Sequence, residues 1–408
     1  MAIQPLNIGV SQPVLDDLQD RLSRTRWPNE IEGAGWDYGV NLGYLRELCS
    51  YWQTQFDWRA QEDYLNTFHH FHTEVDGFGI HFIHHTGTGP DPIPLLLTHG
   101  WPDSFVRFLK IIPMLTDPKA YGASGPSFDV VVPSLPGFAF SDKPTEGGMS
   151  FQVADLWDKL MTEQLGYSHY VAHGGDWGST VTEQLARSHS HSVLAIHLTD
   201  VPFYHSFQKP SDLSAEEKEF LGKLETFPRT EGAYAMIQST RPQTLAYGLN
   251  DSPAGLAAWL VEKFRNWSDC EGDVEKRFTK DELLTNVMIY WATATINSSF
   301  LPYYDRANAG AMRWAVEALK TWIGSSDVPA GFALFPKDLS TPPREWAERF
   351  FNVQRWTDMP RGGHFAAMEE PALLAGELRQ FFHAVRDGGQ PQNLEGAAIL
   401  ADLPVPNL

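Results

Sequence analysis

The chain has 408 residues, of which 42% are hydrophobic and 13% aromatic, which is enough to bury one large globular core. Its 31 basic and 51 acidic residues give a formal net charge of -20. A charge of this sign repels phosphate backbones and anionic lipid surfaces, so we expect neither nucleic acid nor a membrane surface as a partner.

The cysteine content and the first residues of the chain favour a cytoplasmic location. Cys49 and Cys270 are the only cysteines, and they lie far apart without any CxxC or Cys/His spacing. We therefore expect no disulfide framework and no metal site, which fits a reducing cytoplasm. The chain start lacks a basic segment followed by an apolar run, and no stretch reaches the roughly 18 apolar residues of a membrane span. The expectation is a cytoplasmic protein.

The first 75 residues, rich in tryptophan and broken by prolines and glycines, are expected to form an N-terminal helical arm. After them, short apolar runs alternate with helical patterns. Buried parallel strands are expected over 93–102, 128–137, 168–178 and 193–200. Helices are expected over 104–115, over 150–165 with Ser150 as N-cap, and over 179–189. Repeated strand–helix units predict an α/β sheet with helices on both faces.

The pattern changes after residue 200. Consecutive helices without strands predict a helical lid over 201–317, after which strands resume at 328–336 and 353–360 and a helix follows at 371–385. The expected organisation is an arm (1–75), a core (76–200 and 318–388), the lid and a tail (389–408).

The segment GGDWG at 174–178 follows an expected strand and precedes an expected helix. Small residues two positions before and two positions after Asp176 match the spacing of a nucleophile elbow, a sharp turn that exposes one side chain above the sheet. The alternative is a buried aspartate that caps the helix beginning near Trp177. Two further segments favour the elbow.

The first is HGWPDS at 99–104, which follows another expected strand and resembles the HGxP loop of α/β-hydrolases. In that loop a backbone N–H faces the elbow, so the N–H groups of Trp101 and Trp177 are expected to form an oxyanion hole. The resemblance also implies a cis bond between Trp101 and Pro102. His99 is expected to hold the loop by hydrogen bonds and not to catalyse.

The second is RGGHFAAMEEP at 361–371, which places His364 after the last expected strand. In a hydrolase triad an acid orients the histidine and stabilises its cation. Asp338, two residues after an expected strand, is the favoured acid. Asp200, at the end of an earlier strand, and Asp327 are the alternatives.

Six segments together resemble the microsomal-type and fungal epoxide hydrolases over most of the chain. They are HGWPDS, LPGFAFSDKP (135–144), GGDWGS, STRPQTLAYGLNDSPAGLAAW (239–259), YWATATINSSFLPYYD (290–305) and RGGHFAAMEEP. The resemblance implies an α/β-hydrolase fold, a mostly parallel sheet flanked by helices with a helical lid and an N-terminal helical arm. It implies epoxide hydrolysis without a cofactor, and the membrane anchor of the microsomal enzymes has no counterpart here.

The resemblance also implies that two lid tyrosines hold the epoxide oxygen. Tyr234 and Tyr304 match this pair, and the adjacent Tyr303 is the alternative for the second position. Lid tyrosines commonly serve only in packing, but a phenol can hydrogen-bond or protonate the oxygen that becomes negative as an epoxide opens.

Four further residues are expected to line the substrate pocket: Met236, Ile237, Gln238 and Pro102. An apolar lid rich in aromatic residues indicates a small hydrophobic epoxide, which reacts with water. The sequence is also compatible with a homodimer.

An aspartate suits this chemistry better than a serine would. A serine that opened an epoxide would be left as an ether, whereas Asp176 would be left as an ester, which an oxyanion hole and a histidine base can hydrolyse. We therefore expect Asp176 to attack and His364, oriented by Asp338, to activate water, so that a vicinal diol forms. Activity should fall as the pH drops through the pKa of His364, about 6.5 if unperturbed.

Two other functions are compatible with parts of this pattern. A haloalkane or haloacid dehalogenase uses the same aspartate, tryptophan and histidine, but it holds a halide with N–H donors, so the tyrosines favour an epoxide. A non-catalytic receptor with a hydrolase-like fold is the alternative of another class, because fold does not fix function. The complete set of aspartate, histidine, acid and tyrosines argues against it.

Overall fold

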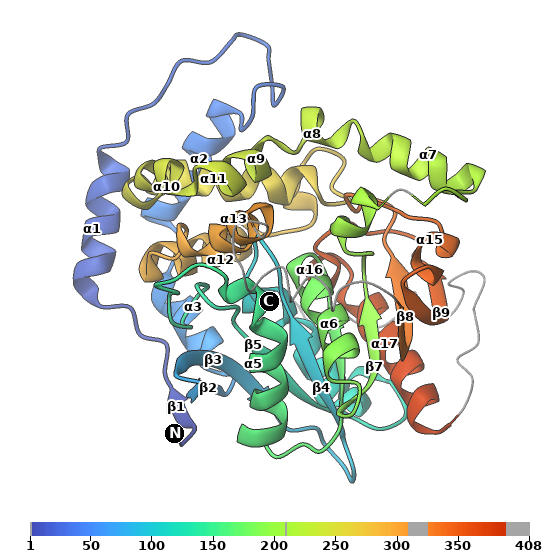
Figure 1. Ribbon diagram of the computed structural model, residues 1–408. Helices are drawn as coiled ribbons and strands as arrows, with labels where there is room; N and C mark the ends of the chain where they lie inside the picture. Colours follow the sequence, from blue (N-terminus) through green and yellow to red (C-terminus); the bar gives the residue numbers. More distant parts are fainter. Residues whose placement is uncertain (1, 209, 309–324, 389–408) are drawn as a thin grey trace.

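The computed structural model describes residues 2–208, 210–308 and 325–388. Its centre is a nine-stranded sheet with the strand order β1-β2-β3-β5-β4-β6-β7-β8-β9 (Figure 1). The strands are β1 (Gln4–Leu6), β2 (His70–Val75), β3 (Phe78–His85), β4 (Ile93–Thr98), β5 (Phe128–Pro133), β6 (Tyr170–Gly174), β7 (Val193–Leu198), β8 (Ser326–Leu334) and β9 (Phe351–Asp358). The strands from β5 to β9 are parallel, whereas β1, β2 and β3 are antiparallel at one edge. The predicted, mostly parallel α/β sheet is confirmed.

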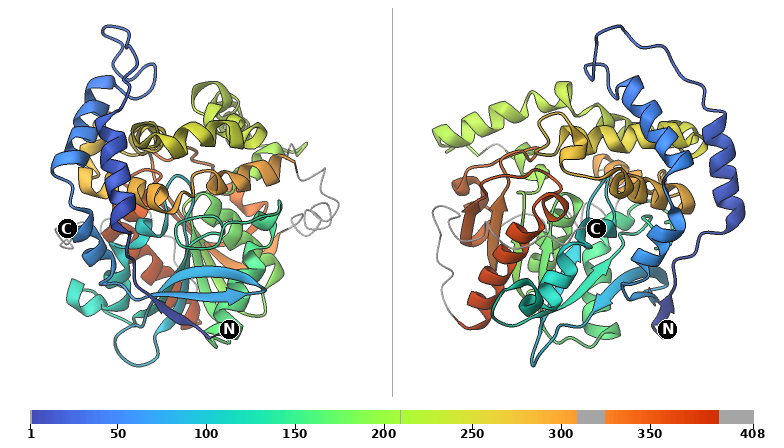
Figure 2. Two further views of the ribbon diagram at one scale, coloured as in Figure 1. Left: turned by 90° about the vertical axis from the view of Figure 1, so that its left-hand side faces the viewer. Right: turned by 180° about the vertical axis from the view of Figure 1, so that it is seen from behind.

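Helices cover both faces of this sheet, as the two views of Figure 2 show. On one face α5 (Val153–Lys159) packs against α6 (Trp177–Ser188), and on the other α4 (Ile111–Thr116) packs against α17 (Pro371–Arg386). All residues of β5 and β6 are buried. Burial on both faces explains why these strands are continuous apolar runs in the sequence.

A helical lid between β7 and β8 covers the carboxyl ends of the parallel strands (Figure 1). Its helices are α7 (Ala215–Leu224), α8 (Phe227–Thr230), α9 (Ala233–Thr240), α10 (Pro242–Asp251), α11 (Pro253–Asn266), α12 (Lys280–Thr293) and α13 (Leu301–Ala307). Residues 309–317 of the predicted lid, 318–324 of the predicted core and the predicted tail lie outside the described residues. In the described ranges, no helix has the length and apolar character needed to cross a membrane.

Shorter helical elements connect these parts. They are η1 (Phe105–Phe108), η2 (Pro118–Tyr121), η3 (Met149–Phe151), η4 (Leu160–Gln164), η5 (Phe203–Phe207), η6 (Val274–Lys276), η7 (Ser298–Phe300), α15 (Arg344–Glu348) and α16 (Ala366–Glu369).

The first 75 residues form the predicted helical arm but are not wholly helical. The arm contains α1 (Gln12–Ser23), α2 (Leu42–Thr54) and α3 (Trp58–Leu65), and α1 and α2 contact α11 of the lid. The sequence prediction omits β1, β2 and β3, which extend the sheet. Asp76 and Gly77, both with positive φ, form the two-residue turn from β2 to β3, and Asp-Gly is a strong hairpin signal. The division predicted at residue 75 therefore passes through a hairpin.

Two core helices differ from their predicted bounds. The helix predicted over 104–115 is split into η1 and α4, because Pro113 has no N–H to donate and is accepted only near the start of a helix. Ser150 is not an N-cap. It lies in η3, and its Oγ donates to Asp305 at 2.9 Å, so its hydroxyl is not available to α5.

Candidate active site

Asp176 lies on the turn between β6 and α6. Its backbone angles are φ 58° and ψ -124°, a conformation that a residue other than glycine rarely adopts and that is often found at functional sites. The turn needs small neighbours, because a Cβ on Gly178 would lie 2.0 Å from the carbonyl oxygen of Thr98. Asp176 makes no side-chain capping bond to α6. The geometry is that of an elbow and not of a helix cap.

We expect Gly178→Ala to lower the free energy of unfolding by about 3 kcal/mol, because the new methyl group meets a backbone carbonyl of β4 that cannot rotate away. Chemical denaturation would measure the change. Gly222→Ala in α7 is the control, since a Cβ there has nothing within 4 Å and alanine favours a helix over glycine by about 1 kcal/mol. Unchanged stability of Gly178→Ala would contradict the close approach of the elbow to β4.

Two backbone N–H groups hold the carboxylate of Asp176. The N–H of Trp101 donates to Oδ1 at 2.8 Å, and the N–H of Trp177 also hydrogen-bonds the carboxylate. The expected cis bond between Trp101 and Pro102 is present. Gly100 allows the loop to come close, because a Cβ there would lie 2.3 Å from Oδ1 of Asp176. The two N–H groups are thus placed to stabilise negative charge on this carboxylate.

His99 supports this loop. Its Nδ1 lies 2.9 Å from the carbonyl oxygen of Gly100, and its Nε2 accepts a hydrogen bond from the N–H of Leu135 at 3.1 Å. Both ring nitrogens therefore contact backbone groups, as the expected loop-holding role requires.

His364 faces Asp176 from the loop between β9 and α16. Its Nε2 lies 3.7 Å from Oδ2 of Asp176, and its Nδ1 lies 2.7 Å from Oδ1 of Asp338. Asp200 instead accepts the backbone N–H of Asp176 at 2.9 Å, and Asp327 is an exposed residue near the start of β8. Of the three candidate acids, Asp338 is the one that contacts the imidazole.

The pKa of His364 is raised to about 9. Burial acts to lower it, but the charge of Asp338, the hydrogen bond to that carboxylate and the charge of Asp176 outweigh burial. Burial raises the pKa of Asp176, and the charge of His364 opposes that rise. The two carboxylates therefore favour the cationic form of the imidazole at neutral pH, unlike the unperturbed histidine assumed from the sequence.

Two lid tyrosines lie over the Asp176 turn. Tyr234, on α9, is buried and stacks on the ring of Trp101 with a centroid distance of 5.1 Å. Tyr303, on α13, meets the rings of Trp177 at 5.1 Å and of Tyr234 at 5.8 Å, both edge-on. Burial, and then neighbouring negative charge, raises the pKa of both phenols. Both therefore keep their protons and are O–H donors.

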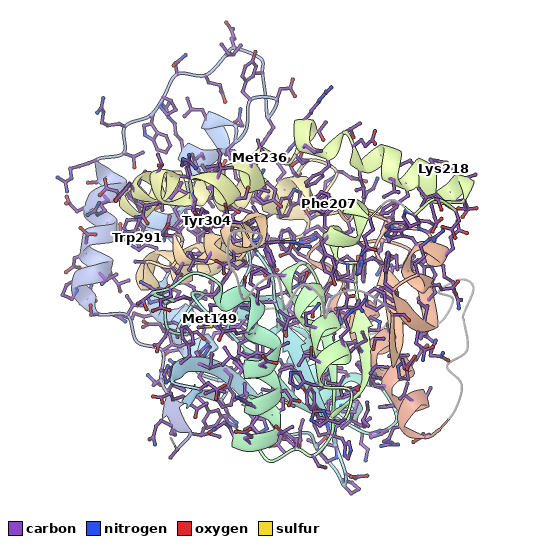
Figure 3. All side chains as sticks on the ribbon, in the orientation of Figure 1. Met149, Phe207, Lys218, Met236, Trp291 and Tyr304 are labelled. Atoms are coloured by element: carbon purple, nitrogen blue, oxygen red, sulfur yellow. The ribbon has the colours of Figure 1, made fainter. Side chains whose placement is uncertain are left out.

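Tyr304, the expected second donor, does not lie in this site. Its side chain is 37% exposed and projects from α13 at the lid surface (Figure 3). Successive residues of a helix point about 100° apart, and Tyr304 lies away from the side of α13 that Tyr303 presents to Tyr234. The alternative considered from the sequence, Tyr303, is the residue that faces Tyr234.

Of the four residues expected to line the pocket, two are exposed and two are buried. Met236 is 59% and Ile237 39% exposed, and Met236 lies at the outer surface of α9 (Figure 3), so these two do not agree with a pocket position. Gln238 is buried and lies one helical turn after Tyr234 on the same face of α9. Pro102 is buried beside Trp101.

The sequence prediction missed a buried ion pair that supports the site. Arg107, on η1, pairs with Asp103 and donates its other Nη to the carbonyl oxygen of His364. Burial acts to raise the pKa of Asp103, but the charge of Arg107 lowers it to about 2. The pair joins the Trp101 loop to the His364 loop. The sequence feature that could have indicated this pair is the four-residue spacing of Asp103 and Arg107, which suits an ion pair on a helix.

Comparison with known proteins identifies the family. The family model "Epoxide hydrolase N terminus" matches residues 3–108, and "alpha/beta hydrolase fold" matches residues 93–234. A putative epoxide hydrolase of Stigmatella aurantiaca is 43% identical over 94% of this chain and 86% of its own length. Epoxide hydrolase 1 of Sus scrofa is 38% identical over 93% of this chain and 88% of its own length.

Two solved structures are similar over almost their full length. Juvenile hormone epoxide hydrolase of the silkworm Bombyx mori has a TM-score of 0.85 at 29% identity, covering 95% of each chain. The Aspergillus niger epoxide hydrolase has a TM-score of 0.80 at 32% identity, covering 94% of this chain and 97% of the other. This chain therefore belongs to the epoxide hydrolase family within the α/β-hydrolase fold, and it is a hydrolase that acts on epoxides.

Proposed function

We propose that Asp176 opens the epoxide by attacking one ring carbon through Oδ2, which leaves a hydroxyalkyl ester on the enzyme. The observation that supports this most directly is the different surroundings of the two carboxylate oxygens. Oδ1 accepts the N–H of Trp101 at 2.8 Å, whereas Oδ2 faces Nε2 of His364 at 3.7 Å. Oδ2 is thus the oxygen left to attack, and the ester carbonyl oxygen, Oδ1, already lies in the oxyanion hole.

The alkoxide formed by ring opening receives its proton in the lid. Tyr234 is a buried and Tyr303 a partly buried O–H donor, beside Trp101 and Trp177 respectively. Their hydroxyls would bond the epoxide oxygen and protonate it as its bond to carbon breaks. The imidazolium of His364 then restores the phenol proton and becomes neutral.

Hydrolysis of the ester follows from the same charges. Esterification removes the negative charge of Asp176, one of the groups that raise the pKa of His364, so the imidazole becomes easier to keep neutral. Neutral His364 takes a proton from water, and the resulting hydroxide attacks the ester carbonyl. The diol leaves, and Asp176 and the imidazolium of His364 return to their starting forms.

A single turnover in ¹⁸O-labelled water tests this route. The first diol should be unlabelled, because its new oxygen comes from Oδ2 of Asp176, and the label should enter the diol only in later turnovers. Label in the diol of the first turnover would mean that water attacks the epoxide directly.

The two steps are expected to respond to pH in opposite directions. In the free enzyme the pKa of His364 is about 9, so kcat/KM should fall as the pH rises through about 9, because the proton source for the alkoxide is lost. In the ester the pKa of His364 is lower, and kcat should fall as the pH drops through that value, because a protonated imidazole cannot act as a base. Steady-state profiles of both parameters measure this, and a low-pH midpoint of kcat at or above 9 would contradict the proposal.

We propose a hydrophobic epoxide, such as an aryl epoxide, as the substrate class. The ring of Trp101 contacts four other aromatic rings: Tyr234, Trp267, Phe300 and Tyr303. Aromatic walls favour apolar and aromatic ligands over strongly hydrated ones. A panel of epoxides matched in size but different in polarity tests this, with kcat/KM expected to rise with hydrophobicity.

We also propose a cytoplasmic location. Cys49 and Cys270 are both buried free thiols, and the cytoplasm keeps thiols reduced. Cell fractionation with an antibody against the protein would test the location.

A further inference from the structure

We propose that Asp158, His189 and His191 form a zinc-binding site at the end of α6 opposite Asp176. One ligand atom from each residue can be chosen so that all three lie within 4.8 Å of one another. Two imidazoles and a carboxylate are a donor set that zinc accepts, with a fourth position open to water. Because α6 has 12 residues, this site lies about 18 Å along the helix from the nucleophile.

Two of the ligands already have the spacing of a metal site. Oδ2 of Asp158 lies 3.2 Å from Nδ1 of His189. Zinc bonds of about 2.0–2.1 Å at a tetrahedral angle place two ligand atoms about 3.3 Å apart. His191 is exposed, so its side chain is free to turn toward this pair and supply the third ligand.

The remaining polar atoms of the two preset ligands are already bonded. Oδ1 of Asp158 accepts hydrogen bonds from the hydroxyls of Tyr170, at 2.9 Å, and Ser192, which leaves Oδ2 for an ion. Nε2 of His189 lies 2.7 Å from Oδ1 of Asp155. A carboxylate on the outer nitrogen of a ligating histidine is a regular feature of zinc sites, where it fixes the ring and raises its basicity.

A metal-free explanation exists for part of this cluster. A protonated His189 would pair with both Asp155 and Asp158 and would need no third partner. That explanation gives no role to His191, whose ring centroid lies 6.0 Å from that of His189. The effect of replacing His191 therefore distinguishes a zinc site from a simple ion pair.

The test is calorimetric titration of the full, tag-free chain, stripped with a chelator, with zinc chloride. We expect one zinc ion per chain, binding at least tenfold weaker in His191→Ala, and about tenfold weaker in Asp155→Asn, as for other outer carboxylates. His169→Ala is the matched control, because His169 is also exposed but lies outside the cluster. Its zinc affinity should equal that of the unmodified protein.

Thermal unfolding gives a second measurement. Zinc should raise the Tm of the unmodified chain and of His169→Ala, because an ion that binds only the folded state stabilises it, but not the Tm of His191→Ala. Without zinc, all three proteins should turn over epoxide equally. Equal zinc affinity in His191→Ala and the unmodified chain, or no binding at all, would overturn the proposal. Inhibition of every variant with a single zinc bound would place the ion at the catalytic group and would overturn it too.

Discussion

His364→Gln is expected to stop turnover and to leave the enzyme as a stable ester. Asp176, the two backbone N–H groups and the lid tyrosines are all retained, so the epoxide still opens, more slowly because the imidazolium no longer supplies protons. The base for the second step is lost. Removal of one member of a catalytic triad lowers kcat by about 10⁴-fold or more. Intact mass spectrometry after incubation with an epoxide should show an adduct equal to the whole epoxide mass.

The controls for this experiment separate the nucleophile from the reaction class. The double variant Asp176→Asn, His364→Gln should give no adduct. Parallel incubations with haloalkanes test the dehalogenase alternative, since displacement of a halide would add only the alkyl group. An adduct from haloalkanes and not from epoxides, or an adduct that persists without Asp176, would contradict the proposed chemistry.

Residues fixed by the local backbone could be predicted from the sequence. Asp176, Trp101 and His364 each follow a parallel strand, and the carboxyl ends of such strands meet at one edge of the sheet. The glycines around Asp176 are required because Thr98 approaches within 2.0 Å of where a Cβ on Gly178 would lie. A position that accepts only glycine can be recognised from the residue types alone. The segments that follow the strands were therefore enough to predict where the site lies.

Residues whose orientation depends on tertiary packing could not be predicted in the same way. Whether Tyr303 or Tyr304 faces inward depends on the rotation of α13 about its axis, which is set by its contact with α9. The same holds for Met236 and Ile237, which are exposed although their neighbour Gln238 is buried. A short apolar helix does not by itself specify which side packs against the core.

The charge state of His364 could not be predicted from the sequence either. The pKa of His364 depends on Asp338, Asp176 and Arg107 together with burial. These groups come from the loop after β8, the elbow and η1, three segments far apart in the chain. Their separations, and therefore the sum of their effects, exist only once the sheet has formed.

Removing the hydroxyl of either lid tyrosine, Tyr234 or Tyr303, is expected to slow ring opening strongly. Tyr234→Phe and Tyr303→Phe should each slow ring opening by about 10²-fold, because each removes one O–H donor from a buried site where negative charge develops. Both phenyl rings keep their contacts with Trp101 and Trp177, so the pocket should keep its shape. The rate of ester formation, followed by rapid quench and intact mass in a single turnover, measures this step alone.

Tyr304→Phe is the matched control for this pair, because it makes the same chemical change one residue along α13, at an exposed position. Its rate of ring opening should equal that of the unmodified enzyme. The double variant Tyr234→Phe, Tyr303→Phe should be slower than either single variant if the two phenols act on the same oxygen. A large loss in Tyr304→Phe with full activity in Tyr303→Phe would mean that α13 rotates when substrate binds and exchanges the two tyrosines. The comparison therefore tests both the chemistry of the donors and the orientation of the helix that carries one of them.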